Sequence, residues 1–231
     1  MGFCSHEQFS LTTRTVVSYN VQNDRSHMED RMKDMSTKKR ILYVALTLFS
    51  EKGYDGVGVD LIAENVGMKG PSLYRHFKGK EDIFNSLIDL VASHYEDGFG
   101  LEEKPEESPE SMDALIENAM RRIEFTMKDD VVRKTRRILA MEQFRSKRMA
   151  ELTTQYHLEN LQQMYAEIFA VLMEKGILKK DNPEYLALEF VSPVSLLIHM
   201  YDRQPEREGE VMDKIRKHFE HFTKVYSEEQ M

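Results

Sequence analysis

The sequence contains only one cysteine, Cys4, among its 231 residues. A single cysteine cannot form an intramolecular disulfide, and it excludes a zinc site built on cysteine thiolates. No apolar run reaches the roughly 20 residues that a membrane-spanning helix needs. The first residues also lack the basic and then apolar pattern of a secretory signal. These absences predict a protein of the reducing cytoplasm with no membrane partner.

Sequence signatures of catalysis are also missing. There is no G-x-S-x-G, no H-E-x-x-H and no recognisable pair of nucleophile and base. The glycine-rich stretch GYDGVGVD follows a helical pattern rather than a strand, unlike a nucleotide-binding loop. His218 and His221 have a spacing that can bind a metal, but no third ligand is fixed nearby. We therefore predict no enzyme, no cofactor and no metal site.

The sequence does contain the material for a large core, with 12 Phe, 10 Tyr and 15 Met. Residues 1–35 show no helical period, so we expect them to be a disordered N-terminal extension. Met28, Met32 and Met35 each offer a later start, which leaves open whether this segment belongs to the natural product.

From Ser36 onward the sequence is that of an all-α protein. A first helix begins near Thr37 with an apolar stripe, and Gly53 ends it. The stretch VDLIAENV (59–66) predicts a second, short helix, and a third begins at Pro71. Two short helices joined by a turn at Gly67 are typical of a helix-turn-helix. We therefore predict a three-helix, helix-turn-helix DNA-binding domain over residues 36–82.

A larger helical domain is expected over residues 83–226, followed by a tail at 227–231. The polar, proline-containing stretch LEEKPEESPE (101–110) reads as a linker inside it. Apolar periodicity beyond the linker predicts helices at about 111–128, 131–149, 150–175, 184–202 and 206–226.

Charge is distributed unevenly between these segments. The whole chain carries a formal net charge of −8. Residues 37–80 hold eight Lys or Arg and four Asp or Glu, a local +4, whereas residues 81–110 hold ten acids and one Lys, a local −9. A basic N-terminal segment in an otherwise acidic protein favours DNA binding by that segment and disfavours it elsewhere.

Residues 37–84 resemble the DNA-binding domain of the TetR family of transcriptional regulators. The resemblance rests on ILYVALTLFSEKGYDG, on VDLIAENVGMKGPSLYRHFKGKEDIF and, within the second, on the L-Y-x-H-F-K-x-K core. It implies a homodimer, a pocket for a small molecule inside the C-terminal domain, and release of DNA when that molecule binds. The fold that it implies is TetR-like, with a ligand-binding and dimerisation domain after the helix-turn-helix.

The resemblance also assigns expected contacts to double-stranded DNA. It places Tyr74, His76 and Lys80 on phosphate-contacting positions. It places other residues on or near base-reading positions, or at the entry of the first helix: Lys69, Gly70, Ser72, Arg75, Thr37 and Lys38. Two positions depart from the family pattern. Gly58 stands where a hydroxyl residue usually begins the second helix, and Gly70 replaces a base-reading side chain found in some members.

The C-terminal domain offers weaker signals. Two apolar stripes near the chain end predict a four-helix dimer interface, although packing within one protomer is the alternative. Their residues are Leu186, Phe190, Val194, Leu197, Tyr201, Val211, Ile215, Phe219, Phe222 and Tyr226. Candidate pocket-lining residues, each of which could equally be core, are Phe125, Met141, Phe144, Tyr165, Phe169 and His199. The basic run Arg133–Arg148 is expected to be a solvated helix face.

The sequence therefore favours a homodimeric repressor that an unknown small-molecule effector releases from a near-palindromic operator. A DNA-binding regulator without a small-molecule ligand, controlled by a partner or acting as an activator, is the first alternative. A helical enzyme that uses its N-terminal helices only for assembly is the second. The effector, the operator and regulated genes, and the sign of regulation cannot be read from the sequence.

Overall fold

The structure is a computed structural model that describes residues 35–99, 109–145 and 147–228. The described residues form helices and turns with one isolated bridge between Leu178 and Ser227, and no β-strand. The all-α prediction is confirmed for this part of the chain. Residues 1–34 of the predicted N-terminal extension (1–35) and most of the predicted linker lie outside the described residues, so nothing tests those two predictions.

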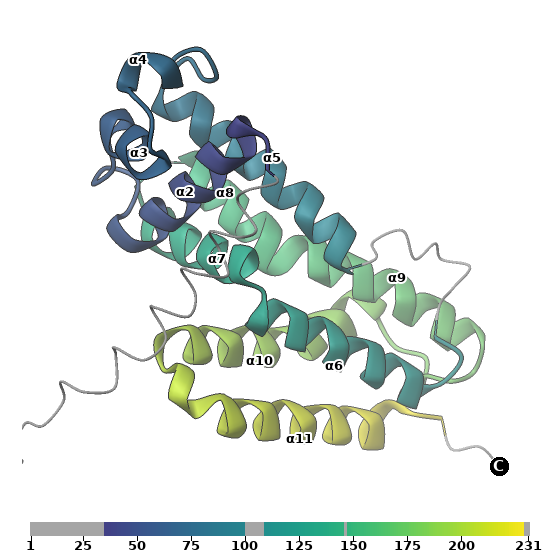
Figure 1. The fold of residues 1–231 in the computed structure, drawn as a ribbon. Coiled ribbons are helices and arrows are strands. Elements are labelled where there is room, and N and C mark those ends of the chain that lie inside the picture. Colours follow the sequence, from purple (N-terminus) through teal and green to yellow (C-terminus); the bar gives the residue numbers. More distant parts are fainter. Residues whose placement is uncertain (1–34, 100–108, 146, 229–231) are drawn as a thin grey trace, which may run out of the picture.

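Three helices and the start of a fourth make the N-terminal domain (Figure 1). These are α2 (Thr37–Lys52), α3 (Val59–Val66), α4 (Gly70–Leu73) and α5 (Lys80–Phe99). The Ser36 hydroxyl caps α2 by accepting a hydrogen bond from the N–H of Lys39. The domain core gathers around Phe49, which is fully buried. It extends to Val91, so the core continues along α5 beyond the predicted boundary at residue 82.

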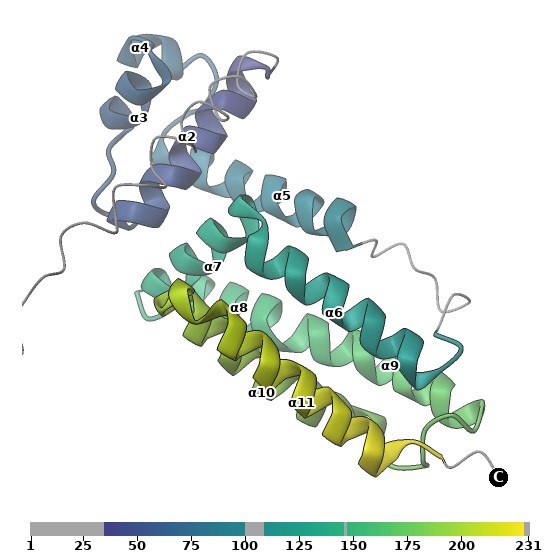
Figure 2. The ribbon, with the colours of Figure 1, turned by 60° about the horizontal axis from the view of Figure 1, so that its bottom comes forward.

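The remaining helices build the C-terminal domain. They are α6 (Met112–Lys128), α7 (Asp130–Glu142), α8 (Lys147–Thr154), α9 (Asn160–Glu174), α10 (Pro183–Arg203) and α11 (Glu208–Tyr226), with a 3₁₀ turn at Pro205–Arg207. Asn182 caps α10, and Pro183 occupies its first turn, as the sequence pattern indicates. Both views of the ribbon place α10 and α11 side by side, at the end of the molecule opposite α4 (Figures 1 and 2).

The middle of the C-terminal domain differs from the sequence-based prediction. The helix expected over 131–149 ends at Glu142, where the N–H of Arg145 turns back to donate to the Glu142 carbonyl. The helix expected over 150–175 is interrupted by a π-helical turn, Gln155–Glu159, between α8 and α9. In this turn the N–H of Asn160 donates to the carbonyl of Gln155, five residues back.

Two helices of the C-terminal domain also serve the N-terminal core. Val131 and Ile138 of α7 and Met149 of α8 belong to the same buried cluster as Phe49. The second cluster is formed by α6, α9, α10 and α11, and Tyr165 of α9 is part of it. The continuous segment α8–α9 therefore contributes apolar side chains to both cores, with the π-turn between its two halves.

Candidate nucleic-acid interface and internal cavity

The turn between α3 and α4 is fixed by backbone geometry. Gly67 adopts the left-handed conformation with φ 78° and ψ 33°, which a side chain would strain. Its N–H donates to the carbonyl of Glu64 at 3.0 Å, and the N–H of Met68 donates to that of Ala63 at 2.9 Å. These bonds close the end of α3. Lys69 then begins α4, with Pro71 in the first turn.

Four of the predicted DNA-contacting side chains are exposed together on this turn. Lys69, Arg75 and His76 are exposed, and Tyr74 has 57% of its surface free. Leu73 and Phe77 are buried beneath them and fasten α4 to the core. The charged and hydrogen-bonding groups at this tip are therefore held outward on a packed base.

The remaining predicted contacts lie beside this tip and are partly engaged. The guanidinium of Arg75 donates to the hydroxyl of half-buried Ser72 at 3.0 Å. The ammonium of Lys80 lies 4.1 Å from the ring centroid of Tyr54, which is cation–π geometry. Lys38 is exposed, and its ammonium lies 5.4 Å from the ring centroid of Phe77. Thr37 is half-buried at the start of α2.

The two glycine departures have different local settings. A Cβ added at Gly70 would lie 3.0 Å from the Asp60 carboxylate oxygen, closer than side chains normally pack. Any side chain at position 70 would therefore require Asp60 to move. Gly58 begins α3 without a side-chain cap, and a Cβ there would meet nothing within 4 Å. Space alone does not explain the glycine at position 58.

Two residues that support this tip were not identified from the sequence. Arg40 of α2 donates from Nη2 to the carbonyl of Val66 at 3.2 Å, which satisfies the C-terminal end of α3. Glu142, only 3% exposed, accepts a hydrogen bond from the N–H of Tyr54 at 3.0 Å. Both stand in charged stretches, where sequence reasoning assigns such residues to solvent.

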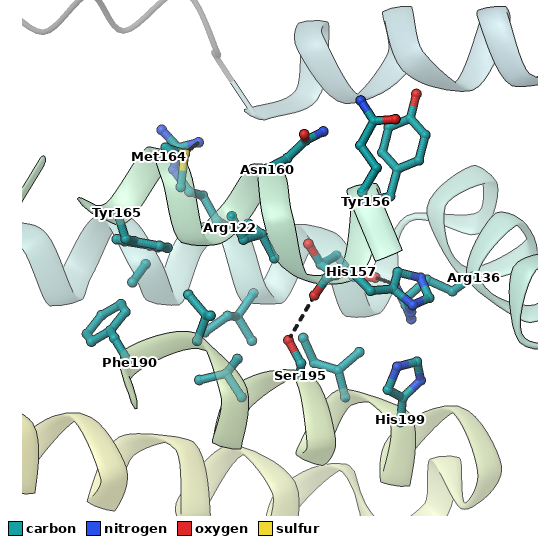
Figure 3. Close-up of a pocket in the computed structure, with 18 of the residues that line it drawn as sticks. Arg122, Arg136, Tyr156, His157, Asn160, Met164, Tyr165, Phe190, Ser195 and His199 are labelled. Atoms are coloured by element: carbon teal, nitrogen blue, oxygen red, sulfur yellow. Dashed lines mark hydrogen bonds between the residues drawn. The ribbon is translucent and has the colours of Figure 1, made fainter. Parts of the chain in front are cut away.

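The C-terminal domain encloses a cavity of about 350 Å³ (Figure 3). It is lined by residues of α6, α7, the π-turn, α9, α10 and α11, with apolar side chains predominating. Tyr165, Phe190 and Met164 lie at one end in Figure 3, whereas His157, His199 and Ser195 gather at the other. A cavity of this size can hold a small organic molecule.

A buried ion pair stands at the polar end. Arg136, 4% exposed, donates to both carboxylate oxygens of Asp202, at 2.8 Å from Nε and 2.6 Å from Nη2. Its Nη1 donates to the carbonyl of Thr126 at 2.6 Å. Arg136 belongs to the basic run that was expected to be solvated. For this residue the expectation is wrong, because a carboxylate and a carbonyl satisfy its guanidinium inside the domain.

Two neighbouring histidines complete the polar end. The ring centroids of His157 and His199 are 5.1 Å apart in an edge-to-face arrangement. Burial, followed by the proximity of His199 and Arg136, lowers the pKa of His157 to about 4. Burial also lowers the pKa of His199. Both imidazoles are therefore neutral near pH 7, and Nε2 of His157 is buried without a hydrogen-bond partner among the described residues.

The structure brings two of the six predicted pocket residues to the cavity. Tyr165 and His199 line it. Phe169 is fully buried in the neighbouring core, and Phe125 and Met141 lie outside the lining. Phe144 is 92% exposed on the connection between α7 and α8. Sequence reasoning missed His157 and Ser195, whose only signal is a polar residue within a predicted apolar helix.

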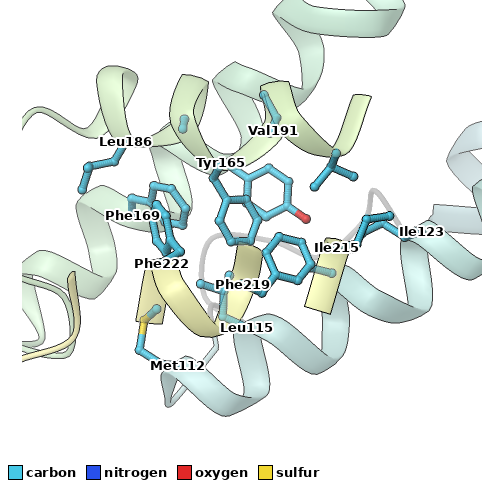
Figure 4. Packing of buried hydrophobic residues seen from close by; sticks show 14 of the residues in the cluster. Met112, Leu115, Ile123, Tyr165, Phe169, Leu186, Val191, Ile215, Phe219 and Phe222 are labelled. Atoms are coloured by element: carbon cyan, nitrogen blue, oxygen red, sulfur yellow. The ribbon is translucent and has the colours of Figure 1, made fainter. Parts of the chain in front are cut away.

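The residues predicted to form the dimer interface face the protomer's own core (Figure 4). Leu186, Phe190, Val194, Tyr201, Val211, Ile215, Phe219 and Phe222 are all buried, and Leu197 and Tyr226 pack partly buried against them. The assignment of these side chains to a contact between protomers therefore needs correction. Within one protomer the buried members are covered by α6 and α9, whereas Leu197 and Tyr226 are only partly covered.

The comparisons with known proteins agree with this arrangement. The family model described as "Bacterial regulatory proteins, tetR family" matches residues 41–87, which hold α3, α4 and most of α2. The match is confined to the helix-turn-helix part of the chain, and it agrees with the resemblance seen in those residues.

Curated relatives match a short part of this chain. The biofilm operon negative transcriptional regulator IcaR of Staphylococcus epidermidis is 40% identical over 73 residues, 28% of this chain. The match spans 40% of the length of that relative.

Solved structures extend the likeness to the whole fold. A TetR-family transcriptional regulator from Mesorhizobium loti covers 83% of this chain and 96% of its own, with a TM-score of 0.66 and 22% identity. SmeT, the repressor of the Stenotrophomonas maltophilia multidrug efflux pump SmeDEF, covers 84% of this chain and 92% of its own, with a TM-score of 0.64 and 16% identity. A SmeT–triclosan complex is similar, with a TM-score of 0.65 and 18% identity. The TetR-like fold predicted from the sequence is thereby confirmed.

Proposed function

We propose that this chain is a homodimeric transcriptional repressor that binds a near-palindromic DNA operator and releases it when a small molecule occupies the cavity. The observation that carries the proposal is the exposed cluster at the α4 tip, where Lys69, Tyr74, Arg75 and His76 project from a buried base. Lysine and arginine neutralise phosphates, and arginine can form two hydrogen bonds to guanine. Such a protein acts where its DNA lies, so we place it in the cytoplasm.

The proposed repression is supported by similar proteins, and the proposed ligand response is supported by the cavity. IcaR is described as a negative regulator and SmeT as a repressor, which favours repression here. The cavity favours a ligand-responsive regulator over one controlled only by a protein partner, because a partner-controlled protein needs no internal space. One of the similar solved structures is a SmeT–triclosan complex, so a structural neighbour binds a small molecule.

We infer that α7 carries the response from the cavity to the DNA-binding domain. Arg136 lines the cavity, and Glu142, less than two turns further along α7, holds the N–H of Tyr54. Between them, Ile138 packs into the N-terminal core. A ligand that shifts α7 therefore moves the loop after α2. The coupling needed is about 1–3 kcal/mol or more.

We propose that the homodimer uses the outward face of α10 and α11. Tyr185 and Leu196 of α10 are 74% and 67% exposed. They stand eleven positions apart, close to three helical turns, and so share one face. Val225 of α11, 37% exposed, adds an apolar group on the neighbouring helix. A two-fold dimer would set two α4 tips about 34–36 Å apart to match the half-sites of an operator.

The test is fluorescence anisotropy of the protein on DNA from immediately upstream of its coding region, run as a salt titration against a scrambled duplex. We expect tight, salt-sensitive binding to the first duplex and weak binding to the second. Equal weak binding to duplexes tiled across the flanking genes would overturn the proposal and reopen the reading of the N-terminal helices as a purely structural element.

A further inference from the structure

The polar end of the cavity has an unmade hydrogen bond. Nε2 of His157 is buried and has no hydrogen-bond partner in the part of the chain that the structure describes. A buried polar atom without a partner carries a cost of about 1–3 kcal/mol, so unpaired atoms of this kind point to a site that a ligand or water completes. The π-turn that carries His157 is itself a feature that recurs at functional sites.

A second hydrogen-bonding group at this end is only weakly engaged. The hydroxyl of Ser195 donates to the carbonyl of His157 at 3.5 Å, the long limit for such a bond (Figure 3). A ligand group entering between α10 and the π-turn can replace this bond at little cost. Ser195 and His157 thus offer a polar corner that links two different segments of the chain.

The charge at this corner is balanced, in contrast to the Met164 end of the cavity, where Arg122 donates to the Met164 sulfur. All three nitrogens of the Arg136 guanidinium donate, two of them to the Asp202 carboxylate. The two imidazoles beside the pair are held neutral by burial. A ligand carboxylate or ammonium would lose its hydration here without gaining a free opposite charge from Arg136 or Asp202. A neutral group is favoured.

We propose that this corner takes the hydroxyl group of an otherwise apolar, uncharged ligand, such as a phenol, bonded to His157 and Ser195. The neutral imidazole can present Nε2 as a donor or as an acceptor, and a hydroxyl satisfies either form. The apolar lining around Ile123, Tyr165 and Phe190 receives the hydrocarbon part. This inference rests on the proposed effector role of the cavity and names the chemical class of effector that it would take.

The test compares three probes of one shape: 4-phenylphenol, biphenyl and biphenyl-4-carboxylate. Their affinities are measured by competition against a fluorescent apolar probe, using the full-length protein without DNA at pH 7.5. We expect 4-phenylphenol to bind about tenfold more tightly than biphenyl, the effect of one well-made buried hydrogen bond. The carboxylate should bind more weakly than the phenol.

Matched variants locate the effect within the cavity. His157→Leu and Ser195→Ala should each reduce the preference for 4-phenylphenol over biphenyl several-fold, while biphenyl binding is retained. Ile123→Val, at the apolar lining, should weaken both probes together and leave their ratio unchanged. Thermal unfolding of each variant checks that it folds. If His157→Leu does not fold, the Ser195→Ala variant alone provides the test.

Three results would overturn the inference: a preference that survives in both polar variants, a carboxylate that binds more tightly than the phenol, or binding of none of the probes. None of these touches DNA binding, which the anisotropy titration measures separately. A protein that selects DNA but ignores all three probes would keep the proposed DNA-binding function and lose this ligand class.

Discussion

The carboxylate of Glu142 accepts a hydrogen bond from the backbone N–H of Tyr54 across 88 residues of sequence. The donor belongs to the loop after α2 and the acceptor to the last residue of α7, so the bond joins the DNA-binding domain to a helix that lines the cavity. The same carboxylate lies 3.6 Å from the guanidinium of Arg145. It is a buried anchor between the two domains.

Removing this anchor should cost stability. Glu142→Ala leaves the Tyr54 N–H without its partner, and we expect the free energy of unfolding to fall by about 1–3 kcal/mol. Glu142→Gln keeps an oxygen acceptor and should cost less. Urea unfolding followed by circular dichroism measures both variants. An alanine variant as stable as the glutamine variant would show that the hydrogen bond contributes nothing.

Acid should destabilise the C-terminal domain through His157. Its pKa is about 4 when folded and about 6.5 when unfolded. Between these values the unfolded chain binds the proton more readily, so stability falls as the pH drops from about 6.5 to 4. The loss is at most about 1.4 kcal/mol for each pH unit. Urea unfolding from pH 7.5 to 4.5 should give a weaker pH dependence in His157→Leu than in the parent, and equal slopes would contradict this.

The α4 tip should separate affinity from specificity. Arg75→Ala should weaken binding to the operator more than to random DNA, because a base contact is lost. Lys80→Ala, at the position expected to contact a phosphate, should weaken binding to both duplexes and lower the salt slope by about one unit. Lys175→Ala, an exposed lysine at the far end of α9, is the control and should change neither. If Arg75→Ala lowers the affinity for operator and for random DNA equally, Arg75 does not contact a base.

The proposed dimer face predicts an effect of Leu196→Glu. Burying a charge in the centre of an apolar contact is costly, so this variant should be monomeric at concentrations where the parent is a dimer. Light scattering after size exclusion measures the mass directly. Phe144→Glu, another exposed apolar residue changed to the same acid, is the control and should stay dimeric. A Leu196→Glu variant with unchanged mass would place the interface elsewhere.

Helix ends were predictable from the sequence, whereas the segments that pack against each helix face were not. Ser36 precedes the first helix and Gly67 ends the second where the sequence predicts, because capping depends on a few neighbouring residues. The apolar stripe through Phe190 and Phe219 was predicted to be a dimer interface, but it is buried within the protomer, which was the alternative. Its period cannot tell whether the protomer's own helices or a second copy cover it, and here α6 and α9 do.

The cavity was predicted in kind but not in detail. Tyr165 and His199 were expected there, but periodicity gives the same signal for cavity lining and for solid core, as Phe169 illustrates. Arg136 could not be assigned from its basic surroundings, because its partner Asp202 is 66 residues away. The π-turn has no marker in the letters QYHLE, which suit an ordinary helix.

The π-turn amounts to one extra residue threaded into a helix. Each residue of an α-helix turns the chain by about 100°, so the insertion changes which side of the rod each half presents. Met149, before the turn, packs in one core, and Tyr165, after it, packs in the other. The π-turn itself carries His157 to the cavity. Inserting or deleting one residue between 155 and 159 would thus rotate α9 relative to α8 and change the polar corner of the cavity. A one-residue change is therefore a short evolutionary route to a new effector on an unchanged scaffold.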